Sequence, residues 1–183
     1  VLLGDSNAKD AILRVPEGDF DLLPGNEELT LAEVKLLQEI GREMRLRQAI
    51  ALIRDKYDFI LIDCPPSINM LTVNALTAAD GVLIPMQCEY YALEGLTSLI
   101  KTIDQVNKTV NPELEIYGLL RTMVDHRINL SNEVSDQLID YFGDKVFRTV
   151  VPRNVTLAEA PSFGRPVLFH DRKSRGALAY LAL

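Results

Sequence analysis

A single acidic residue follows an uninterrupted apolar run in the first half of the sequence. Residues 59–62 read F-I-L-I, and Asp63 comes directly after them, ahead of Pro65 and Pro66. A continuous apolar run of this length is typical of a strand that is buried on both faces of a parallel sheet. Proline cannot continue the hydrogen-bonded ladder of such a strand. We therefore expect a strand over 59–62 that ends at Asp63.

Asp63 has two interpretations, one chemical and one structural. Ligands of open α/β sheets bind outside the carboxyl ends of the strands, and a carboxylate there can hold Mg²⁺, directly or through water, beside the phosphates of a nucleotide. The structural interpretation is that Asp63 is only the polar residue that closes the strand. An apolar run with one aspartate does not separate the two, because so short a motif has many chance matches.

The elements that would position Asp63 alternate along the chain. Apolar runs predict further strands at 20–23, 82–85, 116–124 and 146–151. Apolar residues at three- to four-residue spacing predict helices, which we place at 8–13, 27–56, 67–80, 94–110, 131–142 and from 174 onwards. Alternating strands and helices predict an α/β fold with a mostly parallel sheet flanked by helices. We expect a single domain over residues 1–183.

Single residues refine these boundaries. Gly41 is expected to break or bend the helix at 27–56. Asn129 or Ser131 is expected to cap the start of the helix at 131–142, and Gly143 to end it. The segment up to Pro166 should be rich in loops, with one helical turn.

The composition limits the class of protein. With 183 residues, 48% of them hydrophobic, the chain is long enough for a substantial core. No apolar run approaches the ~18 residues of a membrane helix, and no signal peptide is visible, so we expect a cytoplasmic protein that does not enter a membrane. Cys64 and Cys88 are too few and too far apart for a disulfide framework or a metal site, and we expect both thiols to be buried.

The charge is unevenly distributed. Residues 1–100 hold 8 Lys and Arg against 16 Asp and Glu, which gives −8, whereas residues 101–183 hold 11 against 10, which gives +1. The overall charge of −7 disfavours nucleic-acid binding, but the C-terminal part is the better candidate for a surface that contacts phosphates. The alternative is an ordinary solvated surface of mixed charge.

Three long strings occur in one order along the chain. They read D-F-I-L-I-D-C-P-P-S, A-A-D-G-V-L-I-P-M-Q-C-E-Y-Y-A-L-E-G-L and V-P-R-N-V-T-L-A-E-A-P-S-F-G-R-P-V. Together they closely resemble the ParA/Soj-type partition ATPases, of the deviant P-loop class that also contains MinD. The resemblance extends from Val1 nearly to Leu183. It implies a P-loop NTPase-like fold and the cofactors ATP and Mg²⁺.

The resemblance also implies roles for residues of the nucleotide site. Asp63 matches the Walker-B-like aspartate near Mg²⁺. The switch region that senses the γ-phosphate matches Pro65, Pro66 and Ser67. The segment that lies beside the adenine matches Pro152, Arg153 and Asn154. The structural alternative is that these residues only form a tight turn after a strand.

A further match concerns DNA. The pattern D-x-R-x-N-L at 125–130 resembles the family segment whose arginine contributes to sequence-independent DNA binding, and that arginine matches Arg127. A second position that is often basic in the family is Thr156 here, which is not basic. Two alternatives follow: weaker DNA affinity, or compensation by other cations, namely Arg153, Arg165, Arg172, Lys173 and Arg175. The partners that the resemblance implies are non-specific double-stranded DNA, a second copy in a homodimer and a ParB-like protein that stimulates hydrolysis.

Two family motifs are missing from these residues. There is neither a Gly-rich phosphate loop with its lysine nor the D-P-Q-G-N stretch that positions the attacking water. We therefore expect the chain to lack the first β-α-β unit of the family, to hydrolyse no ATP alone and to self-associate or be unstable. One alternative is a non-catalytic ParA-like DNA-binding or scaffold module. The other is a MinD-like positioning ATPase, which would need a basic amphipathic C-terminal helix that A-L-A-Y-L-A-L does not provide.

Overall fold

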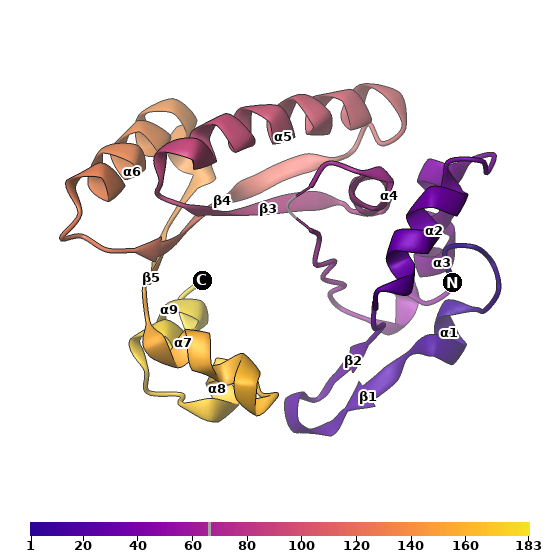
Figure 1. Cartoon of the computed structure of the whole chain (residues 1–183), viewed down its shortest axis with the longest axis horizontal. Helices are drawn as coiled ribbons and strands as arrows, with labels where there is room; N and C mark the ends of the chain where they lie inside the picture. Colours follow the sequence, from indigo (N-terminus) through magenta and orange to yellow (C-terminus); the bar gives the residue numbers. More distant parts are fainter. Residues whose placement is uncertain (66) are drawn as a thin grey trace. The chain divides into compact units, whose positions relative to one another are not determined.

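A computed structural model describes residues 1–65 and 67–183 of the chain (Figure 1). These residues form two compact units. The first unit comprises 1–81 and 99–115, and the second comprises 82–98 and 116–183. The long helix α5 (Tyr90–Thr109) supplies its first half to the second unit and its second half to the first.

The first unit is mainly helical. Its strands β1 (Leu13–Val15) and β2 (Phe20–Leu22) form a short antiparallel hairpin, as Figure 1 shows. Its helices before α5 are α1 (Ala8–Ala11), α2 (Glu28–Leu36), α3 (Arg45–Ala51) and α4 (Met70–Ala78). α4 packs against α2 and α3. Leu36, Ile50 and Leu76 are buried in these three helices and form part of the core of the unit.

The helix expected over 27–56 is divided at Gly41. Gly41 has a φ of +66°, in the left-handed region that glycine enters without steric cost. The buried side chain of Asn74 then fixes the following segment, because its Nδ2 donates to the carbonyl of Arg42 at 2.8 Å and its Oδ1 accepts from the amide of Leu46 at 3.1 Å. The expected break at Gly41 is confirmed, and α2 and α3 are separate helices.

The second unit contains a three-stranded sheet. Its order is β3 (Gly81–Gln87), β4 (Glu115–Val124) and β5 (Val146–Pro152), and β4 and β5 run parallel, with Leu119 opposite Val146 and Val124 opposite Pro152. The predicted α/β class with a parallel sheet is therefore confirmed. Both strands that were expected at 116–124 and 146–151 form within one residue of those boundaries.

Helices cover the strands of this second unit. α6 (Asn129–Phe142) and α9 (Arg175–Leu181) both contact β5. The short helices α7 (Val155–Glu159) and α8 (Val167–His170) pack against α9 and against each other near the end of β5 (Figure 1). Leu119, Leu138 and Ala177 are almost completely buried between these elements.

The strand expected at 59–62 does not form, and this prediction was wrong. Residues 59–62 have no regular secondary structure, and the side chains of Phe59 and Leu61 are 86% and 93% exposed. A strand exists only when another strand accepts its hydrogen bonds, and among the described residues none is paired with this run. Cys64, at the end of the run, is consequently exposed rather than buried, whereas Cys88 is buried as expected.

Two smaller features complete the fold. α6 begins at Asn129 after Ile128, and no side chain caps its start, so the expected capping by Asn129 or Ser131 is not observed. Ser131 is instead buried within the helix, and Gly143 ends the helix as predicted. Within the described part of the chain, no helix has both the length and the apolar character to cross a membrane.

Candidate functional site

Asp63 lies in the irregular segment that leads into α4 of the first unit. Its side chain is exposed, and no described residue donates a hydrogen bond to it or pairs with it. Although Cys64 is exposed overall, partial desolvation raises the pKa of its thiol, and the negative charge of Asp63 adds to the rise. Asp63 is thus an unpaired carboxylate that is free to accept hydrogen bonds from water.

The segment after Asp63 is tied to the start of α4. The side chain of Asn69 caps the helix by accepting from the amide of Thr72 at 3.0 Å. The Oγ1 of Thr72 donates to the carbonyl of Ser67 at 2.7 Å, and Nδ2 of Asn69 is 3.4 Å from Oγ of Ser67. Ser67 is therefore coupled to the first turn of α4. Pro65 is exposed, and the predicted role of Pro66 falls outside the described residues.

This donor set fits a magnesium ion that is shared with a nucleotide. No group of three or more His, Cys, Asp or Glu side chains that could hold a metal occurs among the described residues. Mg²⁺ usually keeps several waters and takes only one or two carboxylates together with phosphate oxygens. One exposed, unpaired carboxylate at Asp63 suits that role and does not suit an all-protein cage.

The second unit places an ion pair in the loop after β4. Asp125 accepts three hydrogen bonds from Arg127: from the backbone amide at 3.1 Å, from Nε at 2.9 Å and from Nη2 at 2.6 Å. The Asp125 side chain is only 17% exposed, whereas that of Arg127 is 90% exposed. These hydrogen bonds from Arg127 hold the pKa of Asp125 far below its ordinary value, and the charge of Arg153 adds to the effect.

The loop after β5 lies beside the loop after β4. The amide of Arg153 donates to the carbonyl of Val124 at 3.1 Å, which joins the carboxyl ends of the two strands. The structure therefore brings together Arg127 and Arg153, the two residues that the sequence predicted to contact DNA. The link between them is Asp125, which the sequence analysis did not single out.

Asn154 has a structural role in the same unit. Its Oδ1 accepts from the amide of Leu157 at 3.2 Å and caps α7. Its Nδ2 remains as a donor, and the base edge of adenine presents acceptors. Gly176 at the start of α9 approaches closely, since a Cβ there would lie 2.4 Å from Cγ of Leu157 and 3.0 Å from Oδ1 of Asn154. Pro152 ends β5 and is half-buried.

Sequence reasoning missed Arg121 on β4. Its Nη1 donates to Oγ of Ser135 on α6 at 2.8 Å, and its Nη2 donates to the carbonyl of Phe147 on β5 at 3.1 Å, while its Nε is buried without a partner. Burial raises the pKa of the Cys88 thiol, and the charge of Arg121 opposes that change. The available signal was a cation within the otherwise apolar run G-L-L-R-T-M-V.

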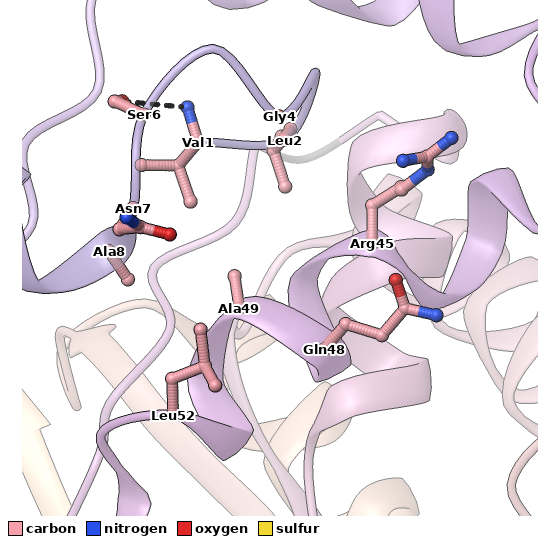
Figure 2. A pocket seen from close by; sticks show the side chains of 10 residues that line it. All are labelled: Val1, Leu2, Gly4, Ser6, Asn7, Ala8, Arg45, Gln48, Ala49 and Leu52. Carbon is pink, nitrogen blue, oxygen red and sulfur yellow. Dashed lines mark hydrogen bonds between the residues drawn. The ribbon is translucent and has the colours of Figure 1, made fainter.

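A hollow in the first unit is separate from these residues. It has a volume of about 170 Å³ and is lined by residues of 1–8, by residues of α3 that include Arg45 and Gln48, and by Leu52 just after α3 (Figure 2). Small-molecule sites usually enclose about 300–1,000 Å³, so this hollow is too small for a nucleoside triphosphate. None of the predicted site residues that the structure describes lines it.

Comparisons with known sequences cover the first part of the chain by a family model and the whole chain by individual relatives. The family model described as AAA domain matches residues 1–116. The sporulation initiation inhibitor protein Soj of Bacillus subtilis is 48% identical over all of this chain and 72% of its own length. The chromosome partitioning protein ParA of Caulobacter vibrioides is 49% identical over all of this chain and 69% of its own length. An uncharacterised Pseudomonas putida protein is 58% identical, and the chain spans 70% of it.

Solved structures match the fold. A Mycobacterium smegmatis protein described as cobyrinic acid a,c-diamide synthase, with bound ADP and magnesium, is 37% identical and has a TM-score of 0.82 over 98% of this chain and 66% of that one. The cell division ATPase MinD of Pyrococcus furiosus has a TM-score of 0.75 over 98% of this chain and 70% of its own. Its identity is only 22%, so this likeness concerns the fold alone.

Proposed function

The chain belongs to the ParA/Soj family of partition ATPases, and we propose that the protein containing it is a Mg·ATP-dependent DNA-partitioning ATPase. In this proposal the protein closes into a homodimer on Mg·ATP and binds double-stranded DNA without sequence preference. A ParB-like protein then stimulates slow hydrolysis, which releases the DNA. The protein would act in the cytoplasm on nucleoid DNA. The observation that carries the proposal is the identity of 48–49% to Soj and ParA over the entire chain.

Asp63 is the proposed anchor of the nucleotide site. As an exposed carboxylate with no partner among the described residues, it would accept hydrogen bonds from water molecules that Mg²⁺ retains. Bound Mg²⁺ supplies positive charge to the phosphate oxygens as negative charge moves between them. Pro65 and Ser67 lie within four residues after Asp63, and Ser67 is hydrogen-bonded to the first turn of α4. A shift of this segment on loss of the γ-phosphate would therefore be transmitted to α4.

Four residues of the second unit complete the proposed roles. Asn154 offers Nδ2 to the adenine while its Oδ1 caps α7. Pro152 supplies an apolar face against the base. Arg127 and Arg153 supply the positive charge for DNA phosphates, which bind cations irrespective of base sequence. Phosphate oxygens and base edges are different ligands, so we assign Arg153 to the DNA and Asn154 to the nucleotide.

The nucleotide role is tested by ATP turnover of the intact protein with DNA and the ParB-like partner present. Asp63→Ala and Asp63→Asn should lower Mg²⁺-dependent turnover by at least about tenfold, because an outer ligand of a metal typically contributes 10- to 100-fold. Asp58→Ala is the matched control, since Asp58 is an exposed carboxylate at the other end of the same apolar run. Equal turnover in the Asp63 and Asp58 variants would contradict the assignment.

Residues 1–183 in isolation should bind and hydrolyse no ATP. They contain no Gly-rich loop with lysine, and it is the backbone amides and lysine of such a loop that hold the phosphates. Calorimetric titration of Mg·ATP into this chain tests the point. Binding that Asp63→Ala abolishes would mean that these residues build a phosphate site of another kind.

The DNA role is tested by the salt dependence of affinity. Arg127→Ala and Arg153→Ala should each reduce the slope of log affinity against log salt by about one, as expected for the loss of one phosphate contact. Arg148→Ala is the matched control because Arg148 is an exposed arginine within β5, away from the ends of the strands. The same slope in all four proteins would favour a scaffold that does not use this surface for DNA.

A further inference from the structure

Asp125 fixes the guanidinium of Arg127 by one of its edges. Nε and Nη2 donate to Oδ1 and Oδ2 at 2.9 and 2.6 Å, a two-pronged arrangement in which the planar groups of arginine and carboxylate face each other. The backbone amide of Arg127 donates to the same Oδ1 at 3.1 Å, so the turn itself is tied to this carboxylate. Both the backbone and the side chain of Arg127 are therefore held by one residue.

The remaining edge of the guanidinium is left for a ligand. Arginine has five N–H donors in a rigid fork, and Asp125 uses the two that lie on the Nε–Nη2 side. Among the residues that the structure describes, none accepts a hydrogen bond from Nη1 of Arg127. The side chain is nevertheless 90% exposed. An exposed arginine normally moves between many rotamers, whereas this one is restrained with its Nη1–Nη2 edge free.

The surroundings make this edge suitable for an anion. The loop of Arg153 is joined to the end of β4 by the hydrogen bond from its amide to Val124, and its charge acts on Asp125. Asp125, Arg127 and Arg153 together carry a net charge of +1, so the carboxylate does not cancel the attraction for phosphate. The Asp125 side chain itself is only 17% exposed.

We propose that Asp125 is a positioning residue for phosphate binding: it holds Arg127 by the Nε–Nη2 edge and presents the Nη1–Nη2 edge to a DNA phosphate. The inference rests on the proposed DNA binding and adds Asp125 to it. As a carboxylate, Asp125 would not contact a negatively charged phosphate directly. Asp125 would raise the affinity for DNA because the Arg127 side chain is already restrained in the free protein. Binding then does not include the entropic cost of immobilising a flexible side chain. The opposite role would be competition, in which Asp125 withholds Arg127 from phosphate.

A double-mutant cycle separates these two roles. Asp125→Asn keeps an Oδ1 acceptor for the turn and removes the charge, so it is the closest available variant. DNA affinity is measured for the intact protein with Mg·ATP, for Asp125→Asn, for Arg127→Ala and for the double variant. In the Arg127→Ala background, Asp125→Asn should strengthen binding, since it only removes a negative charge. With Arg127 present, the same change should be less favourable by about two- to tenfold, the cost of ordering one long side chain.

The sign of this coupling decides the proposal. An equal effect of Asp125→Asn in both backgrounds would reduce Asp125 to a turn residue and overturn it. A larger gain in the presence of Arg127 would make Asp125 a competitor and also overturn it. If Arg127→Ala left both the DNA affinity and its salt slope unchanged, the proposal that this surface binds DNA would be contradicted, and the inference about Asp125 with it.

A second readout needs no DNA. The Nε–H group of Arg127 in the protein alone should show restricted motion by ¹⁵N relaxation, and Asp125→Asn should release it, while Arg148 serves as the exposed reference in both proteins. Restricted motion that Asp125→Asn leaves unchanged would overturn the positioning role even if Arg127 binds DNA. Thermal melting of each variant verifies that the comparison is made between folded proteins.

Discussion

At the scale of single residues, the candidate sites depend on which polar groups already have partners. Asp63 is exposed and has no partner among the described residues, so it is available to a hydrated cation. Asp125 has three hydrogen bonds from one arginine and is unavailable to anything else. Asp63 and Asp125 therefore differ in what they can bind, and we propose a ligand role for Asp63 and a supporting role for Asp125.

The pH dependence of the Asp125–Arg127 pair follows from the lowered pKa of Asp125. A carboxyl whose pKa is lower in the folded protein than in the unfolded chain stabilises the fold above its ordinary value of 3.8 and loses that contribution as the pH falls through its folded value. The difference in melting temperature between the wild-type protein and Asp125→Asn should therefore be constant from pH 7 to about pH 5 and decrease below about pH 4.

A ¹³C titration of the side-chain carboxyl is the direct measurement. Asp125 should stay ionised at acidities that protonate an aspartate of the unfolded chain, whose ordinary pKa is 3.8. Titration of Asp125 together with ordinary aspartates would show that Arg127 does not hold it in solution.

Arg121 gives a second prediction at this scale. Arg121→Met removes the donors to Ser135 and to the carbonyl of Phe147, and the loss should destabilise the protein by about 1–3 kcal/mol because buried acceptors are left unpaired. Arg148→Met on the exposed face of β5 is the control and should change stability by no more than about 0.5 kcal/mol. Urea denaturation measures both variants, and a neutral Arg121→Met would mean that water satisfies these acceptors.

At the scale of elements, close approach of α9 to α7 supports the loop that carries Asn154. Gly176→Ala would place a methyl group 2.4 Å from Cγ of Leu157, and such overpacking typically costs about 1–3 kcal/mol. Gly95→Ala in α5 is the matched control: nothing lies within 4 Å of its added Cβ, and alanine is favoured in helices by about 1 kcal/mol. Thermal denaturation should shift down for the first and not for the second. Equal shifts would contradict the packing argument.

The sequence predicted elements well where the signal is local. The spacing of apolar residues located α4, α5, α6 and α9, and Gly41 correctly predicted the break between α2 and α3. The run at 59–62 failed because a strand depends on a neighbour, which a local apolar pattern does not report. Family resemblance indicated Arg127 and Arg153, but not Asp125, the carboxylate that accepts hydrogen bonds from Arg127. Arg121 was also missed, because its hydrogen-bond partners are 14 and 26 residues away in the sequence and a local pattern does not report them.

At the scale of the whole molecule, the exposed apolar run at 59–62 is expected to promote association between chains. Phe59 and Leu61 are 86% and 93% exposed in an irregular segment, and such runs promote association between chains. Residues 1–183 alone should therefore self-associate, and Phe59→Ser with Leu61→Ser should shift the chain towards monomer in sedimentation velocity. Ile40→Ser is the control, because Ile40 is 95% exposed but lies outside the run. A chain that is monomeric without any substitution would contradict this prediction.

The central claim is that a nucleotide bound near Asp63 controls binding of DNA at Arg127 and Arg153. The most direct test is the affinity of the intact protein for duplex DNA with Mg·ATP, with Mg·ADP and without nucleotide, in wild-type protein and in Asp63→Ala. The account predicts that Mg·ATP tightens DNA binding at least about tenfold in the wild type, a coupling of about 1.4 kcal/mol, and that Asp63→Ala loses this gain. DNA affinity that is the same with and without nucleotide would contradict the ATPase assignment and favour a non-catalytic DNA-binding module.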